Sequence, residues 1–374
     1  MAYSDYKRVS RKRVCLICGK PDWCSFTTDE KISFCARNAR NAARISRTGW
    51  GVFYHDKSFS AISSLSFPAK VPSKRVELAP IEIRHFAYQK LIELSSASNS
   101  EEIINGLKGL RARKILDFEN FGSLPRTLTE RNAIAKNIRN LINKTFPLFV
   151  RQQKSSIDGV PGFWLDKSGK ARLWQDKDYK FPMLLIPYRN EKGLIEACQI
   201  RFMTDSDLRL RYVWLSIPDK SGGLSSGSPL HFATEPLFGK PFLITEGALK
   251  AETVKVFKPG LNIIAAAGVS CSHEQIISSA RFYPLILAFD KDSAENKHVA
   301  RAVANLVLDR FHDSRYYGYN FDLSVLYWDD DTICGIDDAL LQKLKIRKIS
   351  VFEWLESLAG DAKDEAHNIL KEIF

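Results

Sequence analysis

The feature that most constrains the fold is a regular exchange of short apolar runs and amphipathic segments from about residue 240 onward. The runs "PFLITE", "LNIIAAAG", "PLILAFD" and "LSVLYWD" alternate with "ALKAETVKVF", "SHEQIISSA" and "AENKHVARAVANLVLDRF". In the third amphipathic segment one stripe is formed by Val299, Val303, Leu306 and Phe311. Apolar strands separated by such helices are typical of parallel sheets covered on both faces. The pattern predicts an α/β fold with a doubly wound, largely parallel sheet.

Acidic residues follow the ends of these predicted strands. Glu246 follows "FLIT", Asp290 and Asp292 follow "LILAF", and Asp337 and Asp338 come after the last strand and its loop. The carboxyl ends of parallel strands meet at one edge of a sheet. Like charges there are costly unless cations neutralise them, and oxygen ligands favour Mg²⁺ or Mn²⁺. We therefore expect a divalent metal site, although the two aspartates of "DKD" would alternatively only leave a strand and cap the helix at "SAEN".

Four of the seven cysteines lie close together near the start of the chain. The stretch "CLICGKPDWCSFTTDEKISFC" contains Cys15, Cys18, Cys24 and Cys35. Four thiolates suit a tetrahedral Zn²⁺, and a closed four-cysteine site is structural and not catalytic. The residues between the last two cysteines read as strand, polar turn and strand, which predicts a zinc ribbon. The alternative is a set of surface thiols near a flexible end.

Basic residues are in excess over acidic ones. The chain has 55 Lys plus Arg against 43 Asp plus Glu, a net charge of +12 that favours a polyanionic partner. Between about 148 and 235, alternating runs around the turn "RNEKG" predict an antiparallel sheet. Its polar positions are notably basic: Arg172, Lys180, Arg189, Arg201, Arg209, Arg211 and Lys220. Phosphate binding and an ordinary solvated face both fit this pattern.

The segments between these parts define the expected domains. Apolar residues at helical spacing predict helices between about 81 and 145, with Ser100 and Thr129 as N-caps. No apolar run approaches the roughly 18 residues of a membrane span, and no signal peptide is recognisable, so a cytoplasmic protein is expected. The expected divisions are a zinc ribbon at 1–55, a linker at 56–79, a helical and basic mixed-sheet subdomain at 80–239, and the α/β unit at 240–374.

The motifs "LITEGALKAE" and "LILAFDKDS" resemble those of the Toprim domain, which bacterial-type (DnaG-like) primases, topoisomerases and some nucleases share. The order of ribbon, basic sheet, "SPLHFA" and Toprim is similar to that of primases, and the details look closest to primase-like proteins of phages, plasmids and other mobile elements. The resemblance implies that Glu246 is a metal-linked acid or general base. The other roles it implies are metal binding by Asp290, Asp292, Asp337 and Asp338, and nucleic-acid or nucleotide binding by Arg189, Arg201, Arg211, Lys220 and Lys250.

One position departs from the family pattern. Many cellular primases have a further aspartate four residues after the Toprim glutamate, and this chain has Lys250 there. The departure leaves open the number and strength of the metal sites.

The resemblance implies a DNA primase that makes short RNA primers on single-stranded DNA from nucleoside triphosphates. A Toprim nuclease would use the same acids with water as the nucleophile, and a zinc-plus-Toprim recombination mediator would bind DNA without turnover. A topoisomerase is less favoured, because no further large domain is evident. No GxxxxGK[ST] motif occurs, so a separate replicative helicase is an expected partner. The segment from residue 350 onward is either its contact site or part of the core.

Overall fold

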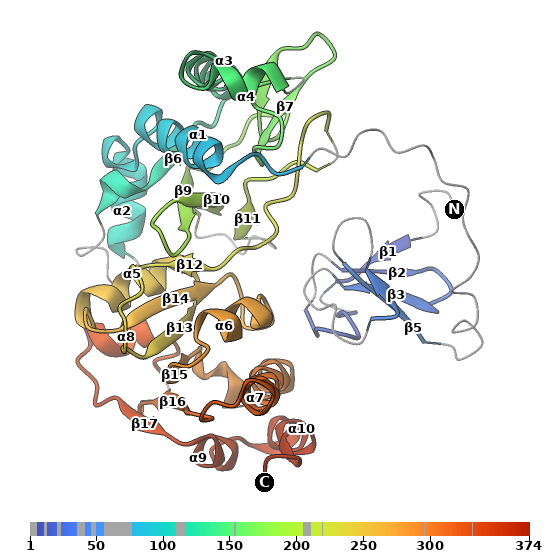
Figure 1. Ribbon diagram of the computed structural model, residues 1–374, viewed down its shortest axis with the longest axis vertical. Coiled ribbons are helices and arrows are strands. Elements are labelled where there is room, and N and C mark those ends of the chain that lie inside the picture. Colours follow the sequence, from blue (N-terminus) through green and yellow to red (C-terminus); the bar gives the residue numbers. More distant parts are fainter. Residues whose placement is uncertain are drawn as a thin grey trace.

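The computed structural model describes most of the chain. The described residues are 6–10, 13–20, 24–35, 42–45, 50–55, 77–109, 117–152, 155–204, 211–218, 220–294, 296–330 and 332–374. Figure 1 shows a small N-terminal sheet unit beside a larger body, in which a helical and sheet part lies above an α/β part. The predicted linker falls almost wholly outside the described residues, as does Arg209.

The N-terminal unit is a five-stranded antiparallel sheet. Its strands are β1 (Tyr6–Arg8), β2 (Ser25–Thr27), β3 (Ile32–Cys35), β4 (Arg44–Ile45) and β5 (Gly51–Tyr54), in the order β1-β2-β3-β5-β4. The hairpin predicted between Cys24 and Cys35 is confirmed as β2 and β3, which pair antiparallel. Besides the four cysteines, the buried apolar residues among the described part of the unit are Val9, Phe26 and Val52, so its hydrocarbon core is small.

Helices follow, as predicted. They are α1 (Ile81–Leu94), α2 (Glu101–Gly109), α3 (Leu128–Thr145) and α4 (Pro147–Gln152), with 3-10 turns η3 (Ala97–Asn99) and η4 (Phe118–Asn120). Ser100 caps α2 as expected, because its hydroxyl accepts the Ile103 amide at 3.4 Å. The prediction of Thr129 as the cap of α3 is wrong. Thr127 has the extended backbone that a cap needs, and its hydroxyl accepts the Glu130 amide at 3.3 Å.

The middle sheet is antiparallel, as predicted. It has the order β11-β10-β9-β6 and consists of β6 (Gly122–Leu124), β9 (Met183–Arg189), β10 (Ile195–Phe202) and β11 (Tyr212–Trp214). The expected hairpin turn is closed by Asn190, whose side-chain oxygen accepts the amides of Lys192 and Leu194 at 3.0 and 2.9 Å. Two further strands, β7 (Phe163–Leu165) and β8 (Ala171–Leu173), form a separate pair.

The C-terminal sheet has the order β12-β14-β13-β15-β16-β17. Its strands are β12 (His231–Phe232), β13 (Phe242–Glu246), β14 (Asn262–Ala266), β15 (Leu285–Ala288), β16 (Leu323–Tyr327) and β17 (Arg347–Ile349). The four central strands are parallel and the two edge strands are antiparallel, which confirms the largely parallel sheet. The sheet includes β12, which lies before the boundary expected at residue 240.

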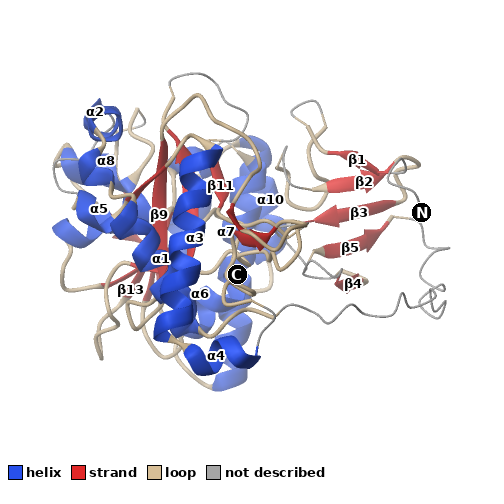
Figure 2. Ribbon diagram, turned by 90° about the horizontal axis from the view of Figure 1, so that it is seen from above, coloured by secondary structure: helices blue, strands red, loops and turns tan. Residues whose placement is uncertain are grey.

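Helices cover both faces of this sheet. They are α5 (Ala248–Phe257), α6 (His273–Ser279), α7 (Lys297–Tyr317), α8 (Ile336–Leu341), α9 (Val351–Glu356) and α10 (Gly360–Leu370), with the 3-10 turn η5 (Lys291–Ala294). Alternate strand residues face opposite layers: Leu243 and Ile286 pack with α5 and α8, whereas Ile244 and Leu287 pack with α6 and α7. Figure 2 shows α5 and α8 on one side of the strands and α7 and α10 on the other.

The C-terminal helices belong to the core. Trp354, Leu358, Ala366 and Leu370 are buried in the same cluster as α7, which favours the packing alternative for this segment over an open contact surface. Within the described part of the chain, no helix combines the length and the hydropathy needed to cross a membrane.

Candidate active site

Carboxylates gather at the carboxyl ends of the parallel strands. Glu246 is the last residue of β13, Asp290 follows β15 by two residues, and Asp337 lies in the first turn of α8. All three carboxylates act electrostatically on one ammonium group, that of Lys250 in the first turn of α5. We call these four residues the acidic edge. The topology of a parallel sheet thus brings together residues as distant in the sequence as Glu246 and Asp337.

Glycines give the acidic edge its shape. Gly247 joins β13 to α5 with φ at +85°, a conformation that other residues rarely adopt. A Cβ at Gly268 would lie 3.8 Å from Glu246 Oε1, and one at Gly335 would lie 2.5 Å from Asp337 Oδ1 and 3.5 Å from Lys250 Nζ. A side chain at Gly335 would therefore crowd the Asp337 carboxylate, whereas one at Gly268 would make only ordinary contact with Glu246.

The lysine of the "DKD" motif has a structural role. Lys291 donates its ammonium to the carbonyls of Trp328 at 2.8 Å and Asp330 at 3.3 Å, and its amide to the Cys334 carbonyl at 3.0 Å. These bonds tie the end of β15 to the loop that follows β16. They hold the "DKD" backbone in place beside the first turn of α8.

The two aspartates of "DKD" are not needed to cap the next helix. Asn296 caps α7, because its side-chain oxygen accepts the His298 amide at 3.1 Å. Asp290 is instead turned toward Lys250, with which it forms an ion pair. Asp292 lies in η5, but its side chain is outside the described part of the structure. Its predicted role as a metal ligand stays a prediction.

The two aspartates of α8 differ in their surroundings. Asp338 is only 2% exposed, whereas Asp337 is partly exposed and is the one whose charge acts on Lys250. Asp337 Oδ1 is buried and, among the described residues, has no hydrogen-bond partner. A buried carboxylate oxygen without a donor is a suitable ligand for a hard cation. Asp337 thus fits the predicted Mg²⁺ or Mn²⁺ site better than Asp338.

In the sequence, Lys250 is a departure from a family pattern and a predicted nucleic-acid or nucleotide contact, and this binding role stays a prediction. In the structure it pairs with Asp290, and both side chains are 22% exposed. Burial alone would lower the pKa of Lys250, but the carboxylates of Asp290, Asp337 and Glu246 outweigh it and raise the pKa above 10.5. The ammonium is therefore charged at neutral pH. No local pattern in the sequence could have revealed a pair of residues forty positions apart.

The cysteines form a tighter cluster than the carboxylates. The four sulfur atoms lie within 4.8 Å of one another, and this is the only such group of three or more potential metal ligands in the described part of the chain. Cys18 Sγ is 3.6 Å from Cys24 Sγ, and all four side chains are buried. Gly19, with φ at +68°, allows the chain to turn around the site. Four buried thiols in this arrangement fit a structural Zn²⁺ and offer no open position.

The predicted basic residues are not all equally accessible. Arg211 and Lys220 are exposed, whereas Arg201 is only 8% exposed and lies over the Tyr212 ring at 5.4 Å. Burial is the main reason that the pKa of Arg201 is lowered, although the guanidinium stays charged. Lys220 lies over the Trp164 ring at 4.8 Å. Tyr212 belongs to the same apolar cluster as Ala248, the first residue of α5.

A cavity of about 300 Å³ lies between β9, β12, α5 and η4. Arg189, Asp117 and Lys255 line it, together with His231 and Glu252, whose Nε2 and Oε1 atoms are 3.0 Å apart. The sequence analysis gave no role to His231 or Glu252, although "SPLHFA" was singled out as a segment. The lining contains both acidic and basic side chains, so its charge favours no single class of ligand.

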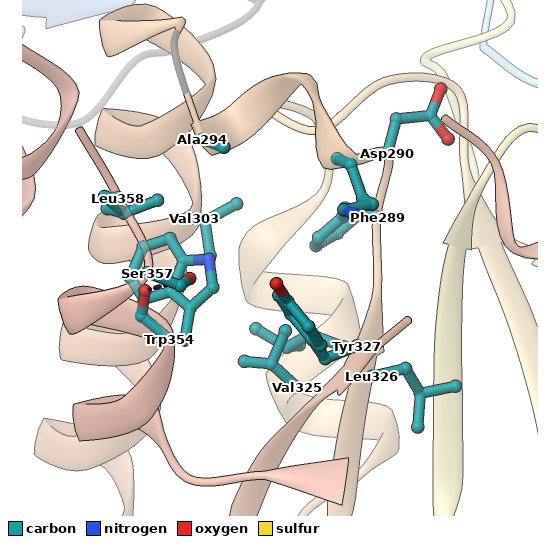
Figure 3. A pocket seen from close by; sticks show the side chains of 12 residues that line it. Phe289, Asp290, Ala294, Val303, Val325, Leu326, Tyr327, Trp354, Ser357 and Leu358 are labelled. Atoms are coloured by element: carbon teal, nitrogen blue, oxygen red, sulfur yellow. Dashed lines mark hydrogen bonds between the residues drawn. The ribbon is translucent and has the colours of Figure 1, made fainter. Parts of the chain in front are cut away.

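A second, much smaller cavity lies next to Asp290. It measures about 40 Å³ and is lined mostly by apolar residues, among them Val303, Tyr327 and Trp354. Figure 3 shows that the Asp290 carboxylate points away from this cavity. The space is about large enough for one water molecule. It belongs to the core behind the strand, whereas the Asp290 carboxylate pairs with Lys250.

Comparisons with known proteins give structural likenesses only. No protein-family model matches the sequence, and no curated protein matches it. The fold is similar to the RNA polymerase domain of Mycobacterium tuberculosis primase DnaG, with a TM-score of 0.47, 16% identity, and coverage of 75% of this chain and 87% of that chain.

Two further solved structures are similar to this chain. The Aquifex aeolicus primase, with its zinc-binding and RNA polymerase domains, has a TM-score of 0.47 and 13% identity, with 100% of this chain and 86% of that chain covered. A DNA primase domain from Pseudomonas aeruginosa has a TM-score of 0.47 and 16% identity, with 74% and 82% covered. Because these sequence identities and TM-scores are low, the functional conclusion depends on the residues of the site itself.

Proposed function

We propose that the chain is a DNA primase, a nucleotidyltransferase that synthesises short RNA primers on single-stranded DNA. The observation that carries the proposal is the acidic edge, where carboxylates from two parallel strands and a following helix meet. The Toprim motifs "LITEGALKAE" and "LILAFDKDS" supply two of these residues, Glu246 and Asp290. A neighbouring sheet with basic side chains and a buried four-cysteine cluster complete the set of parts that such an enzyme needs.

In this proposal, Asp290, Asp292 and Asp337 hold Mg²⁺ or Mn²⁺, which when bound stabilises charge on the reacting phosphate. Glu246 lies at the same edge and accepts the proton of the primer 3′ hydroxyl, either directly or through water. The 3′ oxygen then forms a bond to the α-phosphorus, and the bond to the bridging oxygen of pyrophosphate breaks. The side chains of the acidic edge thus orient the nucleophile and take up its proton.

The basic residues are proposed to bind the phosphates. Arg201 and Arg211 lie on or next to strands whose residues pack beside α5, so they can contact a nucleotide or template that reaches the acidic edge. Arg189, at the end of β9, and Lys220, over the Trp164 ring of β7, are proposed as further phosphate contacts. The ribbon, whose knuckle is packed against His298 of α7, is proposed to hold the single-stranded template near the same edge.

A primer-synthesis assay tests the proposal. The full-length protein is incubated with single-stranded DNA, labelled nucleoside triphosphates and Mg²⁺ or Mn²⁺, beside the variants Glu246→Gln and Glu274→Gln. Glu274 is an exposed residue of α6 and serves as the matched control. We expect short RNA products from the wild type and from Glu274→Gln, and a loss of about 100-fold or more in Glu246→Gln.

The other outcomes distinguish the alternative functions. DNA cleavage without synthesis, lost in Glu246→Gln, would indicate a nuclease that uses water as the nucleophile. Stable DNA binding without any reaction would indicate a recombination mediator. Either result would overturn the primase assignment.

A further inference from the structure

Lys250 places a positive charge among the carboxylates of the acidic edge. It lies in the first turn of α5, the helix that follows Glu246 after the single residue Gly247. The ammonium forms an ion pair with Asp290 and lies 3.5 Å from the position of a Cβ on Gly335, next to Asp337. The ammonium thus lies close to the three segments that supply the carboxylates, which are the end of β13, the turn after β15 and the first turn of α8.

The ammonium is also the fixed cation of this group. The other lysine nearby, Lys291, donates to backbone carbonyls of the loop after β16. The charges of Glu246, Asp290 and Asp337 all act on Lys250, and Asp290 forms an ion pair with it. A positive charge held among three carboxylates neutralises part of their mutual repulsion, as a bound metal ion would.

The spacing of the carboxylates agrees with this role. Their oxygens do not form a group within 4.8 Å of one another among the described residues, whereas the cysteine sulfurs do. Among the described side chains, an ammonium stands beside the carboxylates in place of a preformed site for two adjacent divalent ions. A second divalent ion next to the ammonium would also be repelled by it.

We infer that the Lys250 ammonium takes the place of one divalent cation, so that the acidic edge binds a single Mg²⁺ or Mn²⁺. The inference deepens the proposed function, because it rests on the metal site proposed there. The ordinary alternative is a salt bridge that only stabilises the junction of α5 and the loop after β15. Such a salt bridge would leave the number of bound divalent ions unchanged when the lysine is replaced.

Counting bound Mn²⁺ tests the inference without any nucleotide or activity. The full-length, zinc-loaded protein is titrated with Mn²⁺, and the free ion is measured by electron paramagnetic resonance. We expect one Mn²⁺ per chain in the wild type and two in Lys250→Met, which has a side chain of similar length without charge. The control is Lys255→Met on the same helix, since Lys255 pairs with Glu252 and not with the acidic edge. It should bind one Mn²⁺.

Each other outcome overturns a defined part of the inference. Two ions in the wild type, or one in Lys250→Met, would overturn the role of Lys250 and leave the primase proposal standing. No bound Mn²⁺ in the wild type would overturn the metal site and, with it, both proposals. Circular dichroism checks that each variant is folded, and Lys250→Gln replaces the methionine variant if that one is not. The wild-type count tests the inference in either case.

Discussion

Outside the acidic edge, Glu252 and His231 form a largely buried ionisable pair between α5 and β12. His231 is 1% exposed, and its ring nitrogen lies 3.0 Å from the Glu252 carboxylate, which joins α5 to β12. Burial by itself would raise the pKa of Glu252, but the hydrogen bond and charge of His231, together with Lys255, lower it below 4.5. The carboxylate is therefore ionised at neutral pH and stabilises the native state.

The lowered pKa predicts a pH-dependent effect of Glu252→Gln. At pH 7 we expect the variant to be less stable by about 1.5–3 kcal/mol, the usual loss for a hydrogen bond to a charged group. Because the native pKa lies below the unfolded value of 4.5, this contribution is complete above pH 4.5 and is lost as the pH falls through the native pKa.

Thermal unfolding of the wild type and Glu252→Gln, measured in parallel between pH 7 and pH 3, checks this expectation. The difference in Tm should be largest at neutral pH and should shrink in the acidic range. A difference that stays constant over the whole range would contradict the assignment of an ionised, pair-stabilised carboxylate.

At the scale of elements, the turn from β13 to α5 decides the position of two residues of the acidic edge. Gly247 is the single residue between strand and helix, with φ at +85° and ψ at 138°. A Cβ at this position would meet no atom within 4 Å, so space is not the reason for glycine. The reason is the backbone conformation, which is costly for any residue that has a Cβ.

Gly247→Ala therefore isolates backbone strain. We expect a loss of about 1–3 kcal/mol in stability, and a larger relative loss of primer synthesis, because Glu246 and Lys250 flank the turn. Gly260→Ala is the matched control, since its Cβ would also meet nothing within 4 Å and its φ is not positive. Chemical denaturation should show Gly260→Ala near the wild type, and equal losses in both variants would rule out the strain explanation.

Helices and strands could be predicted from the sequence more accurately than contacts between residues that lie far apart in it. Strands such as "FLITE" and "LILA" are short apolar runs between amphipathic helices, so their type and order follow from periodicity alone. The helix cap at Thr127 was missed because Thr129 is an equally good capping residue two positions later. Strand β12 was missed because two residues, His231 and Phe232, are too few to show a period. The pair of Lys250 and Asp290 depends on how the sheet folds, and no local signal encodes it.

At the scale of the whole molecule, the parts differ in what holds them together. The C-terminal sheet buries apolar side chains on both faces, and the middle sheet has its own large cluster with α1 and α3. The ribbon buries four cysteines with little else. It also touches the body, since a Cβ at Gly19 would fall 2.1 Å from the His298 ring. Its fold and this contact should therefore depend on zinc, whereas the folding of the body should not.

Replacing Cys24 tests whether the ribbon depends on zinc while the body folds without it. Cys24 is fully buried in the cluster, and Cys24→Ser should lose the tightly bound zinc and unfold the ribbon, because zinc binding supplies most of the folding free energy of such units. Cys334→Ser is the control, since Cys334 is exposed and lies outside the cluster.

The readouts are zinc content and amide hydrogen exchange. In Cys24→Ser, exchange should become fast in β2 and β3 and stay slow in β13 and β15, because the body keeps its own hydrophobic cores. Exchange around His298 should also rise, as the ribbon no longer covers the start of α7. Slow exchange in β2 and β3 without zinc would contradict a metal-dependent ribbon, and fast exchange in β13 would contradict an independently folded body.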